Sequence, residues 1–271
     1  MKRVTEFKGR LFEGPIWVKD TLYFVDILNG EIHSLKENEH NVIKFDTYVS
    51  SIQPRKKGGL IATAGKGFYI VNEGKVELLY EVKEWDDRNR FNDGKCDALG
   101  RYWVGTMNLE EKYPTGGLFV LDLNLKFRKV LDNVTISNGL AWSLDNKKFY
   151  YIDSPTKKIF VFDFDLEKGE ISNRRTVIDL SSYPGVPDGM TIDSEGMLWV
   201  ALYGGGRVLR VTEGKILQEI RLPASHVTSV TFGDSDLKTL YITTANEEKD
   251  GGYVYSERVD VKGVETYYCE F

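Results

Sequence analysis

Polar side chains that could hold a cation or a hydroxylated substrate recur along this chain. Glu13, Asn92, Asn138 and Asp188 each lie beside a glycine or one residue from it, at the start of a strand-like run. Carboxylate and carboxamide oxygens are the ligands that hard divalent cations prefer. Buried carboxylates without a partner are costly, so a fold that gathers these four residues creates a natural site for a divalent cation.

The sequence alone allows two roles for these four residues. They can bind a divalent ion, or they can hydrogen-bond one another through water. An all-oxygen donor set favours calcium, magnesium or manganese, because structural zinc normally brings cysteine or histidine. The three histidines, His33, His40 and His226, have no ligand spacing, and we expect each to be a surface or packing residue.

The densest polar stretch is RNRFNDGKCDALGRYWVGTM, residues 88–107. Its first half places Arg90, Asn92, Asp93 and Lys95 around one glycine, and its second half is a turn followed by a strand-like run. In isolation, a run of Asn, Asp and Gly is most often only a turn. Here the same pattern recurs elsewhere, which favours a functional interpretation.

Six segments share one pattern, in which a polar residue and a few strand-like residues precede a short turn and an aromatic-rich strand. They begin at residues 13, 51, 92, 138, 188 and 229, which gives steps of 38, 41, 46, 50 and 41 residues. A repeat of roughly 40 to 50 residues made of short strands is the period of a propeller blade. The sequence therefore predicts an all-β, six-bladed β-propeller. Its inner strands run the same way, so the residues that open the repeats should meet at one mouth of the central channel: Glu13, Ser51, Asn92, Asn138, Asp188 and Ser229.

The repeat leaves no composition break, so we expect residues 1–271 to form a single propeller domain. The 13% aromatic content and 26 glycines fit many strands joined by tight turns. We expect residues 3–9 to complete the last blade, because this removes exposed sheet edges. Residues 81–89 form either a loop over the channel mouth or a solvated connection.

Composition excludes several classes of partner. A net charge of -5 and an isoelectric point near 5.4 argue against nucleic acid, which needs a clustered basic face. No apolar run is long enough to cross a bilayer, and the N-terminus does not read as a signal peptide. We therefore expect a soluble, cytoplasmic protein without a membrane partner. Cys96 and Cys269 are far apart in sequence, so a disulfide framework is not indicated.

The chain resembles the senescence-marker-protein/gluconolactonase/luciferin-regenerating-enzyme family, which includes regucalcin. The resemblance covers nearly the whole chain and rests on FEGPIW, RFNDGKCDALGRYWVGTM, ISNGLAWSLDNKKFYYIDS, VPDGMTIDSEGMLWVA and VTSVTFG. It implies a six-bladed propeller with one divalent metal ion (calcium, zinc, magnesium or manganese) held by the residues that match the family's ligands: Glu13, Asn138 and Asp188.

The resemblance also implies a substrate and its contacts. Arg90 and Asn92 match the family residues that bind a sugar lactone, and an acidic residue after the GTM triplet assists them. Counting from Met107 places Glu110 there; the following loop looks shorter than in animal members, which makes Glu111 a possible substitute. The implied activity is metal-dependent hydrolysis of sugar lactones to aldonic acids.

The residues themselves support this chemistry. A divalent ion polarises a lactone carbonyl and acidifies water. Asp188 can take a proton from that water, and Arg90 can donate to hydroxyls or to the developing oxyanion. No Ser-His-Asp or Cys-His pair stands out.

Two other functions remain open. One is a non-catalytic calcium- or ligand-binding propeller, which loss of Arg90 and Asn92 would have favoured. The other is a metal-dependent esterase or phosphotriesterase of related propeller type. The mouth of the channel discriminates between the enzymes: Arg90, Asn92, Asn108 and Glu110 suit a polyhydroxylated ring, whereas an arylesterase or phosphotriesterase needs an apolar wall.

Overall fold

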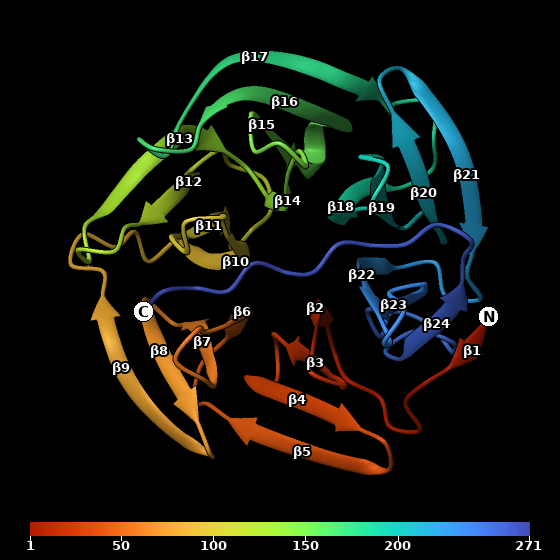
Figure 1. Ribbon diagram of the computed structural model, residues 1–271, viewed down its shortest axis with the longest axis horizontal. Helices are drawn as coiled ribbons and strands as arrows, with labels where there is room; N and C mark the ends of the chain where they lie inside the picture. Colours follow the sequence, from red (N-terminus) through yellow and green to blue (C-terminus); the bar gives the residue numbers. More distant parts are fainter.

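The chain folds into short strands joined by tight turns. The predicted six-bladed β-propeller is confirmed. The computed structural model describes residues 1–271, in which 24 strands form six four-stranded antiparallel sheets around a central channel (Figure 1). The one helical element is the 3₁₀ turn η1 (Ser154–Thr156). No helix has the length and apolar character needed to span a membrane.

Each sheet is built from consecutive strands running from the channel outward, and only the last borrows a strand from the N-terminus. The first three sheets contain β2 (Phe12–Val18), β3 (Thr21–Asp26), β4 (Glu31–Lys36) and β5 (Glu39–Lys44); β6 (Val49–Pro54), β7 (Leu60–Ala64), β8 (Gly67–Asn72) and β9 (Lys75–Glu81); β10 (Asn89–Cys96), β11 (Tyr102–Asn108), β12 (Gly116–Leu121) and β13 (Phe127–Val134).

The other three sheets contain β14 (Ser137–Trp142), β15 (Lys148–Asp153), β16 (Lys158–Asp165) and β17 (Glu170–Asp179); β18 (Val186–Ile192), β19 (Leu198–Tyr203), β20 (Arg207–Thr212) and β21 (Lys215–Arg221); β22 (Val227–Gly233), β23 (Thr239–Thr244), β24 (Val254–Arg258) and β1 (Lys2–Arg3).

The core lies between neighbouring sheets, because each blade packs both faces against other blades. Six separate hydrophobic clusters each join two adjacent blades. One of them packs Trp103 of β11 against Trp142 and Phe149 of the next blade, with ring centroids 6.1 and 5.3 Å apart. Strands β6, β11, β14 and β22 are buried at every residue, while the outermost strands β5 and β9 are largely exposed. This arrangement makes the inner strands rigid supports for the channel.

The N-terminal segment closes the ring, as expected from the need to cover sheet edges. Strand β1 pairs with β24, and two further hydrogen bonds run from Val4 N to Val254 O (2.8 Å) and from Gly9 N to Gly252 O (3.0 Å). In Figure 1 the N-terminus accordingly lies beside β24.

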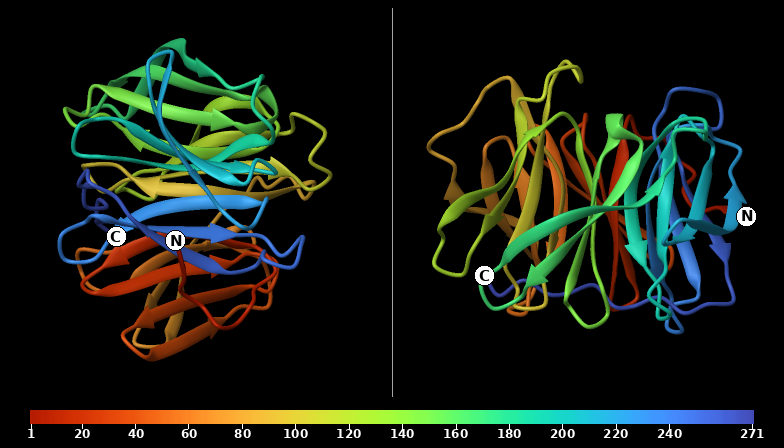
Figure 2. Two further views of the ribbon diagram at one scale, coloured as in Figure 1. Left: turned by 90° about the vertical axis from the view of Figure 1, so that its right-hand side faces the viewer. Right: turned by 90° about the horizontal axis from the view of Figure 1, so that it is seen from above.

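The C-terminal segment, residues 259–271, behaves differently from the sequence-based expectation. After β24 it crosses one face of the disc (Figures 1 and 2), and Cys269 forms a disulfide with Cys96 at the end of β10, with Cα atoms 5.6 Å apart. The expectation of no disulfide was therefore wrong. The distance between Cys96 and Cys269 along the sequence gave no sign that the C-terminal segment returns to the end of β10.

Residues 82–88, which connect β9 to β10, do not line the channel mouth. Trp85 packs on Phe91 with ring centroids 4.7 Å apart, and Asp86 pairs with Arg88. None of these residues lines the cavity at the channel mouth, so of the two interpretations the structure favours a connection between blades over a lid.

Candidate functional site

One mouth of the channel holds a cavity of about 100 Å³ into which the predicted polar residues converge. Of the six residues that open the repeats, Glu13, Asn92, Asn138 and Asp188 line it, and Ser51 and Ser229 are buried beside the channel without lining it. The full lining is Leu11, Glu13, Ile27, Arg90, Asn92, Met107, Glu111, Ile136, Asn138, Ser154, Val186, Asp188 and Tyr203.

A β-bulge aims each of these polar residues into the channel. The pairing of every inner strand with its neighbour shifts register at the same level, for example between Glu13 and Ile16 and between Pro187 and Met190. The other four inner strands shift at the equivalent place. A bulge turns side chains away from the regular alternation and is common beside active sites. The sequence Asp188-Gly189 fits this bend, because a Cβ at Gly189 would stand 2.1 Å from Ser229 Oγ of the next blade.

Three carboxyl groups are buried together under the mouth. Glu13, Asp93 and Asp188 are each 6% exposed. Burial, together with the neighbouring Asp93 carboxylate, raises the pKa of Glu13 to about 8. Burial and the adjacent Glu13 carboxylate raise the pKa of Asp188 well above its ordinary value, and burial also raises the pKa of Asp93. The nearby cations Arg90 and Lys95 therefore offset only part of the negative charge that these carboxyl groups carry when ionised.

The two carboxamides form a fixed hydrogen-bonded chain across two blades. Asn92 Nδ2 donates to Asn138 Oδ1 (3.0 Å) and to Ser137 O (2.7 Å). Asn138 Nδ2 donates to Ser154 Oγ (2.8 Å), which in turn donates to Pro187 O (2.7 Å). Asn138 Oδ1 therefore has a fixed direction and one lone pair left for a ligand.

Arg90 is held at one of its nitrogens and free at the others. Its Nη1 donates to Asn92 Oδ1 (2.7 Å) and to Phe91 O (3.0 Å), so Nε and Nη2 remain available to a molecule in the cavity. Burial lowers the pKa of Arg90, and the nearby Glu13 and Glu111 carboxylates partly restore it. A guanidinium in this position can donate two parallel hydrogen bonds.

The acidic residues after the GTM triplet occupy different positions. Both are exposed, but Glu111, with its backbone in the left-handed region (φ 59°), lines the cavity, whereas Glu110 lies outside the lining. Asn108 is also outside the lining: its Nδ2 donates to Thr115 Oγ1 (2.9 Å) and its Oδ1 accepts from Glu110 N (3.0 Å). Asn108 thus shapes the loop that places Glu111 in the lining of the cavity.

Sequence reasoning missed several members of the site. Asp93 was part of the polar stretch but received no role, although its Oδ2 has no hydrogen-bond partner. Ser154 begins the turn η1 directly after β15, and Tyr203 ends β19; no motif distinguishes either residue. The adjacency of Asp93 to Asn92, on a strand with a bulge, was the one available signal.

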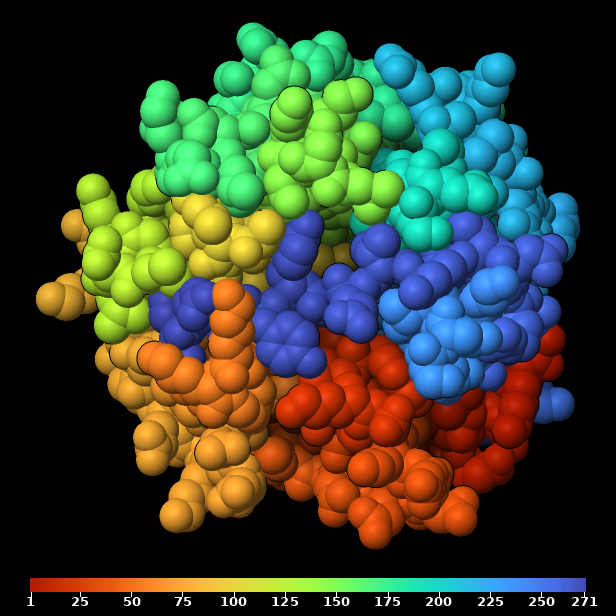
Figure 3. Space-filling view, in the orientation of Figure 1, coloured from red at the N-terminus to blue at the C-terminus, as the bar shows by residue number.

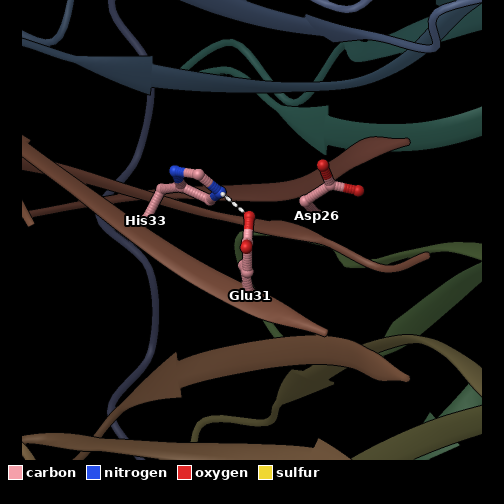
Figure 4. A group of neighbouring side chains, drawn as sticks. All are labelled: Asp26, Glu31 and His33. Carbon is pink, nitrogen blue, oxygen red and sulfur yellow. Dashed lines mark ion pairs between the residues drawn. The ribbon is translucent and has the colours of Figure 1, made fainter. Parts of the chain in front are cut away.

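A second acidic group lies in the first blade, outside the lining of the cavity. Atoms of Asp26, Glu31 and His33 lie within 4.8 Å of one another, and His33 Nε2 is 3.3 Å from Glu31 Oε2 (Figure 4). The Asp26 carboxylate already accepts hydrogen bonds from the backbone of residues 10 and 11 and from Asn29 Nδ2. His33 is buried and stacks on Phe24 with ring centroids 5.0 Å apart, as expected of a packing residue.

The residues at the mouth fit a hard divalent cation. Glu13, Asn138 and Asp188 present oxygen donors to one cavity from three blades, and burial together with the neighbouring carboxylates raises the pKa values of Glu13 and Asp188. A divalent ion is the kind of partner that lets such groups ionise.

Comparison with known proteins places the chain among relatives of the same architecture. The SMP-30/Gluconolactonase/LRE-like region matches residues 11–246. An uncharacterized protein of Sulfolobus acidocaldarius is 70% identical over the whole of both chains. The putative sugar lactone lactonase YvrE of Bacillus subtilis is 41% identical, with 87% of this chain and 84% of that protein covered.

The structure of a luciferin-regenerating enzyme superposes with a TM-score of 0.94 at 33% identity, covering 100% of this chain and 99% of the other. Family match, sequence identity and superposition agree over nearly the whole propeller. The chain belongs to the SMP-30/gluconolactonase/LRE-like family.

Proposed function

We propose that the protein is a divalent-metal-dependent hydrolase that opens sugar lactones to aldonic acids. The observation that carries this proposal is the convergence of Glu13, Asn138, Asp188 and Arg90 on one small cavity. The family match and the similarity to a putative sugar lactone lactonase support the same activity.

The proposed metal ligands are Glu13, Asn138 and Asp188. A divalent ion, when bound, supplies Lewis-acid polarisation of the lactone carbonyl and acidification of water. Asp188 has two carboxylate oxygens, so one can serve as a ligand while the other accepts the proton of the attacking water.

Arg90 and Asn92 are the proposed substrate-binding residues. Arg90 can donate from Nε and Nη2 to ring hydroxyls or to the oxyanion that forms as water adds to the carbonyl. Asn92 holds both Arg90 and Asn138 in place through its carboxamide. The family resemblance allows either Glu110 or Glu111 to be the assisting acidic residue. Glu111 is better placed to accept hydrogen bonds from substrate hydroxyls, because it lines the cavity and Glu110 does not.

One observation favours a second candidate, hydrolysis of less polar esters. The cavity has an apolar rim formed by Leu11, Ile27, Met107, Ile136 and Val186, and the polar Asn108 and Glu110 are outside it. This rim suits a substrate with an apolar substituent. Lactones with alkyl substituents, aryl esters and phosphotriesters therefore belong in the assay.

A substrate panel measured by proton release tests the proposal. Protein treated with a chelator should be inactive on sugar lactones, and calcium, zinc, magnesium or manganese added back singly should restore turnover. Greater kcat/KM for aryl esters or phosphotriesters than for any lactone would support the second candidate. Metal binding without turnover of any substrate would instead identify a binding propeller and contradict both enzymes.

A further inference from the structure

A second cavity, of about 240 Å³, lies at the opposite end of the channel. All six inner strands contribute to it from the ends away from the first mouth. Among them are Ile16 of β2, Gln53 of β6, Lys95 of β10, Trp142 of β14 and Thr191 of β18. The cavity is thus coaxial with the channel, and none of its lining residues belongs to the first mouth.

The C-terminal segment covers this second cavity. Val264, Glu265, Thr266 and Tyr267 line it, and Figure 3 shows the segment lying across the centre of this face. The segment is anchored on both sides of the cavity. Before it, Gly263 N donates to Leu237 O (2.8 Å); after it, Cys269 N donates to Pro54 O (2.8 Å), next to the disulfide to Cys96.

Between these anchors the covering residues are held loosely. Residues 264–268 take part in no backbone–backbone hydrogen bond, and their one side-chain bond runs from Tyr267 Oη to Asn146 Oδ1 (3.0 Å). A segment with few backbone bonds opens at low free-energy cost. The covering segment therefore leaves the cavity accessible to a small molecule.

The interior of the cavity offers one positive charge on a mostly apolar wall. Lys95 Nζ donates one hydrogen bond, to Met190 O (2.5 Å), although an ammonium has three donors. Gln53, 2% exposed, donates from Nε2 to Gly94 O (3.3 Å), and its Oε1 has no partner. The carboxylate of the lining, Glu265, is on the covering segment and exposed to solvent.

We propose that this second cavity binds a small organic anion, with a carboxylate on Lys95 and an apolar body against Ile16, Leu140 and Trp142. Lys95, which is half-buried and also feels the Asp93 and Glu13 carboxyls behind it, selects the charge, because a carboxylate can accept the two free ammonium protons. The apolar wall selects against polyhydroxylated acids, which would lose hydrogen bonds to water there. This site shares no lining residue with the first mouth, and the two are linked only through the charge of Lys95, which offsets part of the charge of Asp93 and Glu13.

Titration calorimetry with 3-phenylpropionate tests this site, and 3-phenyl-1-propanol serves as the uncharged analogue. The carboxylate should bind the parent protein at least about tenfold more tightly than the alcohol, as a charge-assisted hydrogen bond implies. Lys95→Met should remove this preference. Arg90→Met is the matched control, because it deletes the cation of the first mouth and should leave binding unchanged.

A second variant keeps the test decisive if Lys95→Met folds poorly. Thr266→Trp, on the covering segment, places a large ring over the cavity at a residue with no side-chain hydrogen bond, and it should weaken 3-phenylpropionate binding by about tenfold or more. A crystal structure with 4-bromophenylacetate then locates the bromine. No binding by the parent protein, unchanged binding in Lys95→Met, loss of binding in Arg90→Met, or bromine at the first mouth would each overturn the proposal.

Discussion

Asp188 has two proposed duties, metal ligand and proton acceptor, and one substitution separates them. Asp188→Asn keeps the size and one oxygen donor but removes the group that can take a proton from water. We expect kcat to fall by roughly a hundredfold to ten-thousandfold even when titration shows the metal site to be full. Glu110→Gln is the matched control, since it removes one carboxylate outside the cavity. Turnover near that of the parent protein in Asp188→Asn would mean that Asp188 is only a ligand.

Arg90 should act on the substrate and not on the metal. Arg90→Met deletes the free Nε and Nη2 donors, so kcat/KM for hydroxylated lactones should fall roughly tenfold to a hundredfold. Metal content, measured by elemental analysis after dialysis, should match that of the parent protein. Loss of metal from this variant would show instead that Arg90 maintains the ligand geometry through Asn92.

Glu110 and Glu111 form a matched pair for the acidic contact. Glu111 lines the first cavity and Glu110 does not, so Glu111→Gln should raise KM for sugar lactones several-fold while Glu110→Gln changes it little. Steady-state kinetics of both variants with one lactone decide the point. The opposite order would mean that the loop rearranges when substrate binds.

At the scale of elements, the C-terminal segment depends on its disulfide. The bond joins residues 173 positions apart, and in the chain-entropy model a loop of that length contributes up to about 5 kcal/mol to stability. Cys269→Ser should lower the midpoint of guanidinium unfolding, and Cys96→Ser should lower it equally. Addition of a reductant should destabilise the parent protein and leave both variants unchanged. An unchanged midpoint in the variants would show that the backbone hydrogen bonds to Pro54 and Gly100 are enough to hold the C-terminal segment in place.

At the scale of the whole molecule, a metal bound at the first mouth would tie three blades together. With the ion at about a hundred to a thousand times its Kd, binding should add roughly 3 to 4 kcal/mol to the free energy of unfolding.

The same cluster makes the stability of the metal-free protein depend on pH. The raised pKa of Glu13, about 8 against an ordinary 4.5, means that the folded protein holds a proton that the unfolded chain has released. The free energy of unfolding should therefore fall as pH rises from about 5 to about 8. Thermal unfolding across this range, with chelator and with metal, checks the prediction. The loaded protein should lose less stability, because the ion favours the ionised carboxylates; identical pH profiles would contradict a metal at Glu13.

The sequence by itself determined the propeller, the closure of its last blade by the N-terminus, and the four polar residues of the first mouth. These features follow from local information, since strand alternation and turn residues act within a few positions and the period repeats them. Glu13, Asn92, Asn138 and Asp188 occupy equivalent places in their repeats, so the ring brings them together.

Only the tertiary structure decided which neighbours complete the site and where distant segments meet. Glu111 faces the cavity because its loop adopts a left-handed turn fixed by Asn108, and Asp93 joins the carboxylates because of a bulge. Cys269 reaches Cys96 only after the chain has completed the ring and crossed it. Such contacts depend on the closed path of the whole chain, and no local pattern of residues encodes them.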